Sequence, residues 1–308
     1  MLRATVPPPE THKTAWTEPA PGLLVRQSRA YRMNSVVLFE RGHALVIDPG
    51  VLPSEMRDIA SRVAADAPRF EQVTLAFTHA HWDHVLGRDH FPLARTLAHV
   101  GFADELERDT AKIERSAREW VEGEGEPWPR PFEPFRPDLA VRGTARVELG
   151  PFELVAHEVP GHSPSQMALF VPALGALVAG DMLSDIEIPW LDGPPWVYRR
   201  SLTALHWLFE QEDVRLLVPG HGGVALGRVE GYRRVLRDID YLVQLEQRVG
   251  DAFRRGVALE QARAELVAMD YVGKDADYPM NEVHQDNVGF AWTGLLERDP
   301  ADDPEPKA

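Results

Sequence analysis

The chain has 308 residues, of which 44% are apolar and 26% are charged, as in a globular protein with a substantial core. It contains no cysteine, which excludes disulfides, iron–sulfur clusters, thiolate zinc sites and cysteine nucleophiles. The formal net charge of −15 makes nucleic acid an unfavourable partner. No apolar run approaches 18 residues and no secretory signal is evident, so we expect a cytoplasmic protein without a membrane span.

Strands dominate the first part of the chain. Residues 1–22 are rich in proline and polar residues and predict an extended N-terminal arm. Short β-branched segments, LLVRQSRAYRM, SVVLFE and ALVIDPG, then predict strands. Pro53 opens an amphipathic helix that runs to about Asp66. Residues 73–81, VTLAFTHAH, predict a buried strand that leads directly into a group of histidines.

Two loops rich in proline and aromatic residues interrupt the next part. Residues 102–120 predict a helix, and 121–137 predict a long irregular loop because they contain five prolines. Four further strands follow, with the sequences ARVELG, FELVAHEV, MALFVPA and ALVAGDML. The second loop spans 186–198, and a helix is expected over 199–212.

The C-terminal part is predicted to be helical. Residues 226–270 predict a long helix and a shorter one, and 279–297 predict a last helix. We therefore expect an N-terminal arm over 1–22, a mixed α/β catalytic domain over 23–225 and a helical region over 226–308.

A dense cluster of metal-ligand residue types follows the strand at 73–81. His79, His81, Asp83 and His84 fall within six residues, and His79 and His81 project to the same side of an extended strand end. Imidazole and carboxylate groups suit zinc, iron or manganese, and such a cluster can surround two neighbouring cations. The alternative is a set of surface histidines at a loop. Without a metal, however, four such groups packed together would suffer charge repulsion and desolvation.

Three later residues extend this set. His162 lies in the turn PGHSP, Asp181 follows the apolar strand ALVAG, and His221 lies in the turn PGHG after the strand RLLV. Each is a ligand-type residue at the end of a strand next to glycine or proline. Strand ends hold such side chains rigidly while the turns let them converge. Taken singly, each could instead be an ordinary turn residue.

The motifs HAHWDH, PGHS, AGD and PGHG, together with ALVIDPG, resemble the metallo-β-lactamase superfamily over about residues 22–223. The resemblance implies an αββα sandwich with a dinuclear metal site at one edge of the two sheets. It assigns His79, His81 and His162 to one metal, Asp83, His84 and His221 to the other, and Asp181 to both. For Asp48 it implies a role in orienting ligands; a simple cap of the preceding strand is an equal alternative.

The resemblance further implies a hydrolase with two divalent ions, for which zinc is favoured and iron or manganese is compatible. A hydroxide shared by the metals would attack a carbonyl or phosphoryl centre, with Asp83 and Asp181 as the catalytic carboxylates. We expect an ester, lactone or thioester of a small, partly apolar substrate. One lactonase branch carries a tyrosine three residues after the shared aspartate, where this chain has Ser184; Tyr198 could replace that tyrosine.

The two aromatic loops are candidates for lids over the metals. Trp128 on the first loop and Trp190, Trp196 and Tyr198 on the second would form an apolar wall for substrate. Capping of the core or a homodimer interface are alternatives, and the sequence does not fix the oligomeric state. His284 on the last helix is a further substrate-binding candidate, with a histidine bonded to a backbone carbonyl as the alternative.

Other functions compete with this interpretation. A phosphodiesterase or nuclease of the same fold would need a basic groove, against which the net charge argues. A mono-iron dioxygenase of the persulfide type would use fewer protein ligands than this chain offers. A non-catalytic binding module would be expected to have lost some of these ligands.

Overall fold

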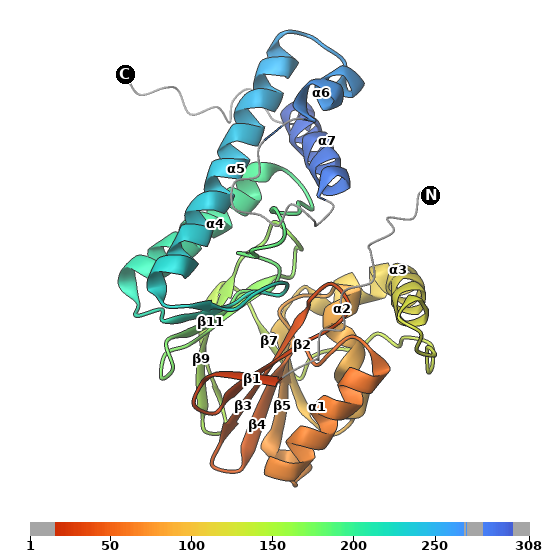
Figure 1. Ribbon diagram of the computed structural model, residues 1–308, viewed down its shortest axis with the longest axis vertical. Helices are drawn as coiled ribbons and strands as arrows, with labels where there is room; N and C mark the ends of the chain where they lie inside the picture. The colour runs from red at the N-terminus through yellow and green to blue at the C-terminus, as the bar shows by residue number, and fades with distance from the viewer. Residues whose placement is uncertain (1–15, 268, 270–279, 298–308) are drawn as a thin grey trace.

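Two β-sheets packed face to face form the centre of the molecule, and helices cover the outer face of each sheet (Figure 1). The computed structural model describes residues 16–267, 269 and 280–297. This architecture confirms the predicted αββα sandwich with a helical C-terminal extension. In the described part of the chain, no helix is both long enough and apolar enough to cross a membrane.

The first sheet has seven strands in sequence order, antiparallel from β1 to β4 and parallel from β4 to β7. The strands are β1 (Trp16–Ala20), β2 (Leu23–Gln27), β3 (Asn34–Glu40), β4 (His43–Ile47), β5 (Val73–Ala76), β6 (Arg95–His99) and β7 (Leu139–Val141). The parallel strands need crossover segments, which are α1 (Pro53–Asp66), η1 (Phe70–Gln72), α2 (Trp82–Val85), η2 (Leu86–His90) and α3 (Phe102–Gly123).

The second sheet has six strands in the spatial order β13-β12-β11-β10-β9-β8. They are β8 (Thr144–Leu149), β9 (Phe152–Glu158), β10 (Met167–Val171), β11 (Ala176–Val178), β12 (Leu216–Val218) and β13 (Ala225–Leu226). Only the pair β11 and β12 is parallel within it. Helix α4 (Pro195–Gln211) makes that crossover.

Three apolar cores correspond to the three interfaces of a four-layer sandwich. The alternate residues of strands that face inward, such as Leu45, Ile47 and Leu169, fill the space between the sheets. A second core joins the first sheet to α1 and α3 through residues such as Ile59. The third joins the second sheet to α4 and the C-terminal helices.

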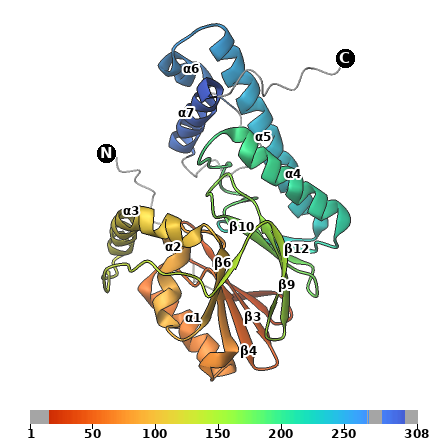
Figure 2. The same cartoon turned by 180° about the vertical axis from the view of Figure 1, so that it is seen from behind.

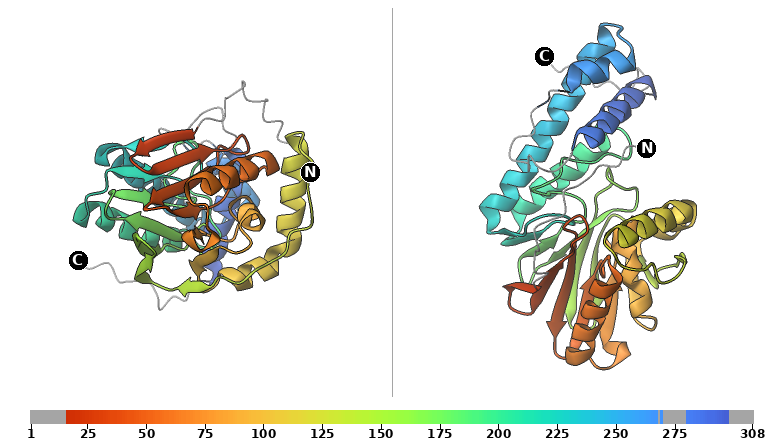
Figure 3. Two further views of the ribbon diagram at one scale, coloured as in Figure 1. Left: turned by 90° about the horizontal axis from the view of Figure 1, so that it is seen from below. Right: turned by 45° about the vertical axis from the view of Figure 1, so that its right-hand side comes forward.

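The C-terminal helices rise above the sheets on the side of α4 (Figures 2 and 3). They are α5 (Arg228–Arg254), α6 (Leu259–Leu266) and α7 (Asn281–Glu297). Buried residues of α5 and α7, including Leu242, Leu245 and Val288, belong to the same apolar core as α4 and the second sheet. The helical region is therefore packed onto the sandwich by a continuous core.

Three element boundaries differ from the sequence prediction. Residues 16–20 of the expected N-terminal arm form strand β1, which pairs with β2; the rest of that arm up to residue 15 lies outside the described residues. Helix α3 continues to Gly123, and the irregular segment begins after it. Helix α4 starts at Pro195, because a proline without an amide proton is well tolerated in the first helical turn. Trp196 and Tyr198 are therefore helical.

Candidate metal centre

The strand ends of both sheets converge on one edge of the sandwich. In the first sheet, parallel strands β4 and β5 end just before Asp48 and His79. In the second, β9, β11 and β12 run in the same direction and end just before His162, Asp181 and His221. Because strands that run in the same direction end at the same edge, side chains far apart in sequence meet there.

Two groups of side chains at this edge could each hold a metal ion. The first contains His79, His81, His162 and Asp181, and the second contains Asp83, His84 and His221. Within each group the donor atoms lie within 4.8 Å of one another. All seven residues predicted from the sequence are thus brought together. The division into two groups follows the implied assignment, with Asp181 placed in the first.

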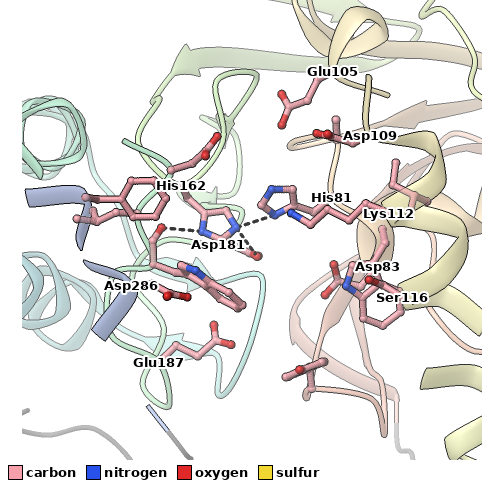
Figure 4. A pocket seen from close by; sticks show the side chains of 18 of the residues that line it. His81, Asp83, Glu105, Asp109, Lys112, Ser116, His162, Asp181, Glu187 and Asp286 are labelled. Atoms are coloured by element: carbon pink, nitrogen blue, oxygen red, sulfur yellow. Dashed lines mark hydrogen bonds and ion pairs between the residues drawn. The ribbon is translucent and has the colours of Figure 1, made fainter. Parts of the chain in front are cut away.

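Asp181 lies between the two groups. Its Oδ2 is 3.1 Å from Nε2 of His162 (Figure 4). The same oxygen is 3.3 Å from Nε2 of His221, which belongs to the other group. Its Oδ1 is 3.1 Å from Nε2 of His84. The carboxylate therefore contacts donors of both groups, as a ligand shared by two ions must.

The histidines are oriented by hydrogen bonds from their outer ring nitrogens. Nδ1 of His162 donates to the Trp190 carbonyl over 3.0 Å, and Nδ1 of His221 donates to the Tyr31 carbonyl over 2.9 Å. A proton on Nδ1 leaves Nε2 with its lone pair facing the centre. His81 is turned the other way, with Nδ1 lying 2.9 Å from Nε2 of His162.

Asp48 supports this arrangement from outside both groups. Its carboxylate accepts hydrogen bonds from the backbone N–H of Thr78 over 2.8 Å and from the Thr78 hydroxyl over 2.6 Å. It also lies 2.9 Å from Nδ1 of His84. Asp48 has a positive φ of 51°, a conformation unfavourable for a residue with a side chain. These contacts fix that conformation, and they connect Asp48 to a candidate ligand.

The chemistry of the donor set fits metal ions. Among the described residues, Nε2 of His79, Nε2 of His84 and Oδ1 of Asp181 are buried atoms without a hydrogen-bond partner. Buried polar atoms are normally paired, because desolvation without compensation is costly. His79 and Asp181 belong to the first donor group and His84 to the second, so cations at the two groups would satisfy these atoms.

The charges within the centre shift the pKa values of its members. Burial alone would raise the pKa of Asp181, but the surrounding imidazoles, His221 foremost, hold it well below its usual value. Burial and the neighbouring His79 and His162 lower the pKa of His81 well below its usual value. Both shifts keep these two candidate ligands deprotonated at neutral pH, as coordination requires, whereas neighbouring carboxylates raise the pKa values of His84 and His221 above their usual value although burial alone would lower them.

A cavity of about 960 Å³ opens directly above the two groups. Its floor includes His81, Asp83, His162, Asp181 and His221. Helix α3 forms one wall, and residues 187–192 with α6 and α7 form the opposite wall (Figure 4). The C-terminal helices therefore complete the cavity.

Aromatic rings stand on both sides of this cavity. Tyr31 packs against Trp120 with ring centroids 4.1 Å apart, and Trp82 stacks on Trp120 at 6.3 Å. Trp190 faces His162 from the other side, with centroids 6.3 Å apart and 44% of its surface exposed. Phe290 of α7 also lines the cavity. The space above the candidate ligands is thus partly apolar.

Of the five expected substrate-binding residues, only Trp190 is among the residues that line the cavity. Trp128 instead donates its indole N–H to Glu114 on α3. Trp196, on the first turn of α4, lies against Gly294. Tyr198 is buried, and its hydroxyl donates to the Asp181 carbonyl over 3.1 Å. Proline-rich residues 124–138 run along α3, and Trp128 on this segment does not line the cavity; a lid role for the first loop stays a prediction.

His284 lies in the core of the C-terminal helices. Its Nε2 donates to the Leu266 carbonyl over 2.9 Å, and its Nδ1 lies 3.0 Å from the Tyr241 hydroxyl. The alternative of a histidine bonded to a backbone carbonyl is the one observed. The cavity contact of α7 comes from Asp286 and Phe290, which point from a different face of the same helix.

Several residues that line the cavity are not marked by any motif in the sequence. Tyr31 reaches the site through a turn in which it and Arg32 have φ values of 53° and 51°, and neither residue type signals such a turn. Glu187 lies six residues after Asp181 without a motif. Glu105, in contrast, could have been recognised from the sequence. It stands three residues after Phe102 on the apolar face of an amphipathic helix, where a carboxylate is unusual.

The chain belongs to the metallo-β-lactamase superfamily. The family model described as "Metallo-beta-lactamase superfamily" matches residues 30–221, which include both donor groups. Among curated proteins, no relative matches the chain. This superfamily includes metal-dependent hydrolases.

Solved structures share the fold at low sequence identity. The stereoselective inverting sec-alkylsulfatase Pisa1 from Pseudomonas sp. is 16% identical with a TM-score of 0.70, over 93% of this chain and 52% of its own. The chain thus spans about half the length of that enzyme. A metallo-β-lactamase family protein from Thermus thermophilus is 19% identical with a TM-score of 0.58, over 86% of this chain and 92% of its own. These similarities establish the fold.

Proposed function

We propose that the chain is a dinuclear metal hydrolase that cleaves an ester, lactone or thioester bond of a small, partly apolar substrate. The observation that carries this proposal is the convergence of seven imidazole and carboxylate donors, five of which line the floor of a cavity with aromatic walls. Zinc is the metal best suited to such donors, with iron and manganese as alternatives.

The proposed ligands divide by the contacts they make. His79, His81 and His162 would hold one ion, and Asp83, His84 and His221 would hold the other. Asp181 would be shared, because its two oxygens contact histidines of both groups. When bound, the ions would lower the pKa of water and polarise the bond under attack.

The protein side chains would supply binding and proton handling. Asp83 lines the cavity floor, and its Oδ2 is 3.3 Å from Nε2 of His221. The imidazoles of His84 and His221 keep its pKa low even though burial alone would raise it. An ionised carboxylate in that position can accept and orient the proton of an attacking water. Trp190 and Phe290 would hold the apolar part of the substrate.

The cavity composition favours carboxylic esters over phosphodiesters. Besides the candidate ligands, the cavity is lined by five carboxylates and three basic side chains. The carboxylates belong to Glu105, Asp109, Glu187, Asp192 and Asp286, and the basic groups belong to Arg108, Lys112 and Arg263. Such an excess of negative charge opposes a polyanionic substrate. A mono-iron dioxygenase is disfavoured because the second group, Asp83, His84 and His221, is complete.

The experiment that tests this proposal is a substrate panel with metal control. Zinc-loaded protein is assayed on ester, lactone, thioester, phosphodiester and sulfate-ester compounds, before and after chelation. We expect hydrolysis of a carboxylic ester, lactone or thioester that is lost on chelation and restored by zinc. Chelator-sensitive cleavage of the phosphodiester alone, or oxygen consumption with iron, would contradict the proposal.

A further inference from the structure

Glu105 is a buried carboxylate in the first turn of α3, next to the turn that carries His162. Only 3% of its surface is exposed. Figure 4 shows its carboxyl group directed toward the His162 side of the cavity. The other buried residues of this helix are apolar, so a buried carboxylate at position 105 is unusual.

The donors to Glu105 come from the residues that follow His162. The Ser163 hydroxyl lies 2.8 Å from Oε1 and 3.0 Å from Oε2, and the Ser165 backbone N–H donates to Oε2 over 3.2 Å. The same Ser165 N–H lies 3.1 Å from Oγ of Ser163. Both serines are completely buried. Glu105 thus organises a small closed network just after a candidate ligand.

This network is strong enough to matter for the geometry of His162. A carboxylate out of water is costly unless it is hydrogen-bonded, so its contacts are retained in the folded protein. His162 is held on its other side by the bond from its Nδ1 to the Trp190 carbonyl. Its backbone is therefore fixed by Glu105 and its ring by Trp190. With both constraints in place, Nε2 faces Asp181 at 3.1 Å.

We propose that Glu105 is a positioning residue for the first metal group, acting on His162 through Ser163 and Ser165. The proposal rests on the metal binding set out in the proposed function. Through Glu105, helix α3, which forms a wall of the cavity, is hydrogen-bonded to the turn that follows a candidate ligand of the first group. The second group, Asp83, His84 and His221, has no contact of this kind with Glu105 among the described residues.

The test is zinc affinity measured separately for the two groups, by competition with a chromophoric chelator. The His221→Ala protein keeps the first group complete, and the His81→Ala protein keeps the second. Glu105→Gln removes the negative charge and leaves a single oxygen to accept from the Ser163 hydroxyl and the Ser165 N–H. In the His221→Ala protein we expect this change to weaken zinc binding by about 10- to 100-fold. In the His81→Ala protein we expect less than about a twofold change.

Glu114→Gln is the matched control, because it changes a glutamate on the same helix. Glu114 also accepts several hydrogen bonds, from Trp128, Phe132 and Arg118, but it lies outside the cavity. Its replacement should leave zinc affinity unchanged in both proteins. If Glu105→Gln fails to fold, Ser163→Ala serves instead, since it removes the hydroxyl donor and leaves the carboxylate.

Two results would overturn the proposal. One is a Glu105→Gln protein that binds zinc at the first group as tightly as the Glu114→Gln protein does. The other is equal weakening at both groups, which would indicate a general loss of structure. Failure of the proposed function is distinguishable, because unmodified protein would then bind no zinc at either group.

Discussion

At the scale of single residues, Asp181 is the side chain on which both donor groups depend. Its oxygens lie 3.1 Å from His162 and from His84, and an opposing charge at this point keeps four imidazoles together. The lack of a side chain at Gly220 leaves space for this carboxylate. A Cβ on Gly220 would lie 2.0 Å from Oδ1 of Asp181, which is closer than any real contact.

Replacing Asp181 by asparagine should remove the negative charge shared by the two groups. We expect loss of at least one metal ion per chain and a decrease in kcat/KM of roughly a hundredfold or more. Elemental analysis and steady-state kinetics measure these effects. The control is Asp192→Asn, which changes an exposed carboxylate of the same cavity and should leave the metal content intact. Equal metal content in both variants would contradict a shared role for Asp181.

Gly220→Ala should displace the Asp181 carboxylate by steric contact alone. We expect reduced metal content in a protein that still folds, because the inserted methyl group meets one movable side chain and the turn at 180–181. Gly123→Ala is the matched substitution, since nothing lies within 4 Å of a Cβ at that position. A Gly220→Ala protein with wild-type metal content would show that the close approach has no consequence.

At the scale of elements, α3 connects the metal edge to the proline-rich segment 124–138. Near its first turn, Glu105 contacts the turn after His162, and further along Glu114 receives the Trp128 indole and the Phe132 N–H. The segment is thus fastened to the outside of α3. The opposite wall, residues 187–192, presents Trp190 to the cavity.

Replacing a tryptophan by alanine should therefore have different effects in the two aromatic segments. Trp190→Ala removes a cavity wall, and we expect KM for an apolar substrate to rise about tenfold with little change in thermal stability. Trp128→Ala removes packing against α3, and we expect a lower Tm with an unchanged KM. Kinetics and thermal unfolding of both variants check this. A raised KM in Trp128→Ala would instead support the first segment as a lid.

Stability near pH 4 should depend on Glu114. Burial alone would raise its pKa, but the Phe132 N–H, Arg118 and Trp128 lower it below the ordinary value of 4.5. Because the folded-state pKa is lower, the stabilisation is complete above the unfolded value and is lost as pH falls through the folded one. Glu114→Gln should cost about 1 kcal/mol at pH 7. That difference from wild type should shrink below about pH 4 in denaturant unfolding; a constant difference would contradict the ionic contribution.

At the scale of the whole molecule, much of the fold followed from the sequence. Strands such as β5 and β11 are short apolar runs bounded by turn residues, and their ends coincide with the ligand motifs. The seven donors were predictable because each motif stands at the end of a strand. The cavity walls were not, because they depend on how α3, α6 and α7 pack, and no local pattern encodes that packing.

The sequence likewise did not predict which residues of the C-terminal helices contact the cavity. These helices were predicted, yet the contact with the site comes from Asp286 and Phe290 and not from His284. Helical periodicity identifies residues that share a face but does not say which face meets the cavity. Likewise, the sequence predicts a loop that includes Trp196, whereas in the structure Pro195 opens α4.

Metal removal should lower the stability of the whole chain. The buried His79, His84 and Asp181 atoms that lack hydrogen-bond partners would lose the cations proposed to compensate them at the two groups. A ligand at a thousandfold excess over its Kd contributes about 4 kcal/mol to the folded state. We therefore expect a Tm several degrees lower in chelated protein, with full recovery on adding zinc, by thermal unfolding. An unchanged Tm would mean that the donor groups bind no ion tightly.

The proposed function requires that the seven donors hold two metal ions. Elemental analysis of protein purified without added metal, and then loaded with zinc and desalted, tests it most directly. We predict two divalent ions per chain in the wild-type protein and one in each of His81→Ala and His221→Ala. One ion per chain in the wild type, or two in both variants, would contradict a dinuclear site built from these residues.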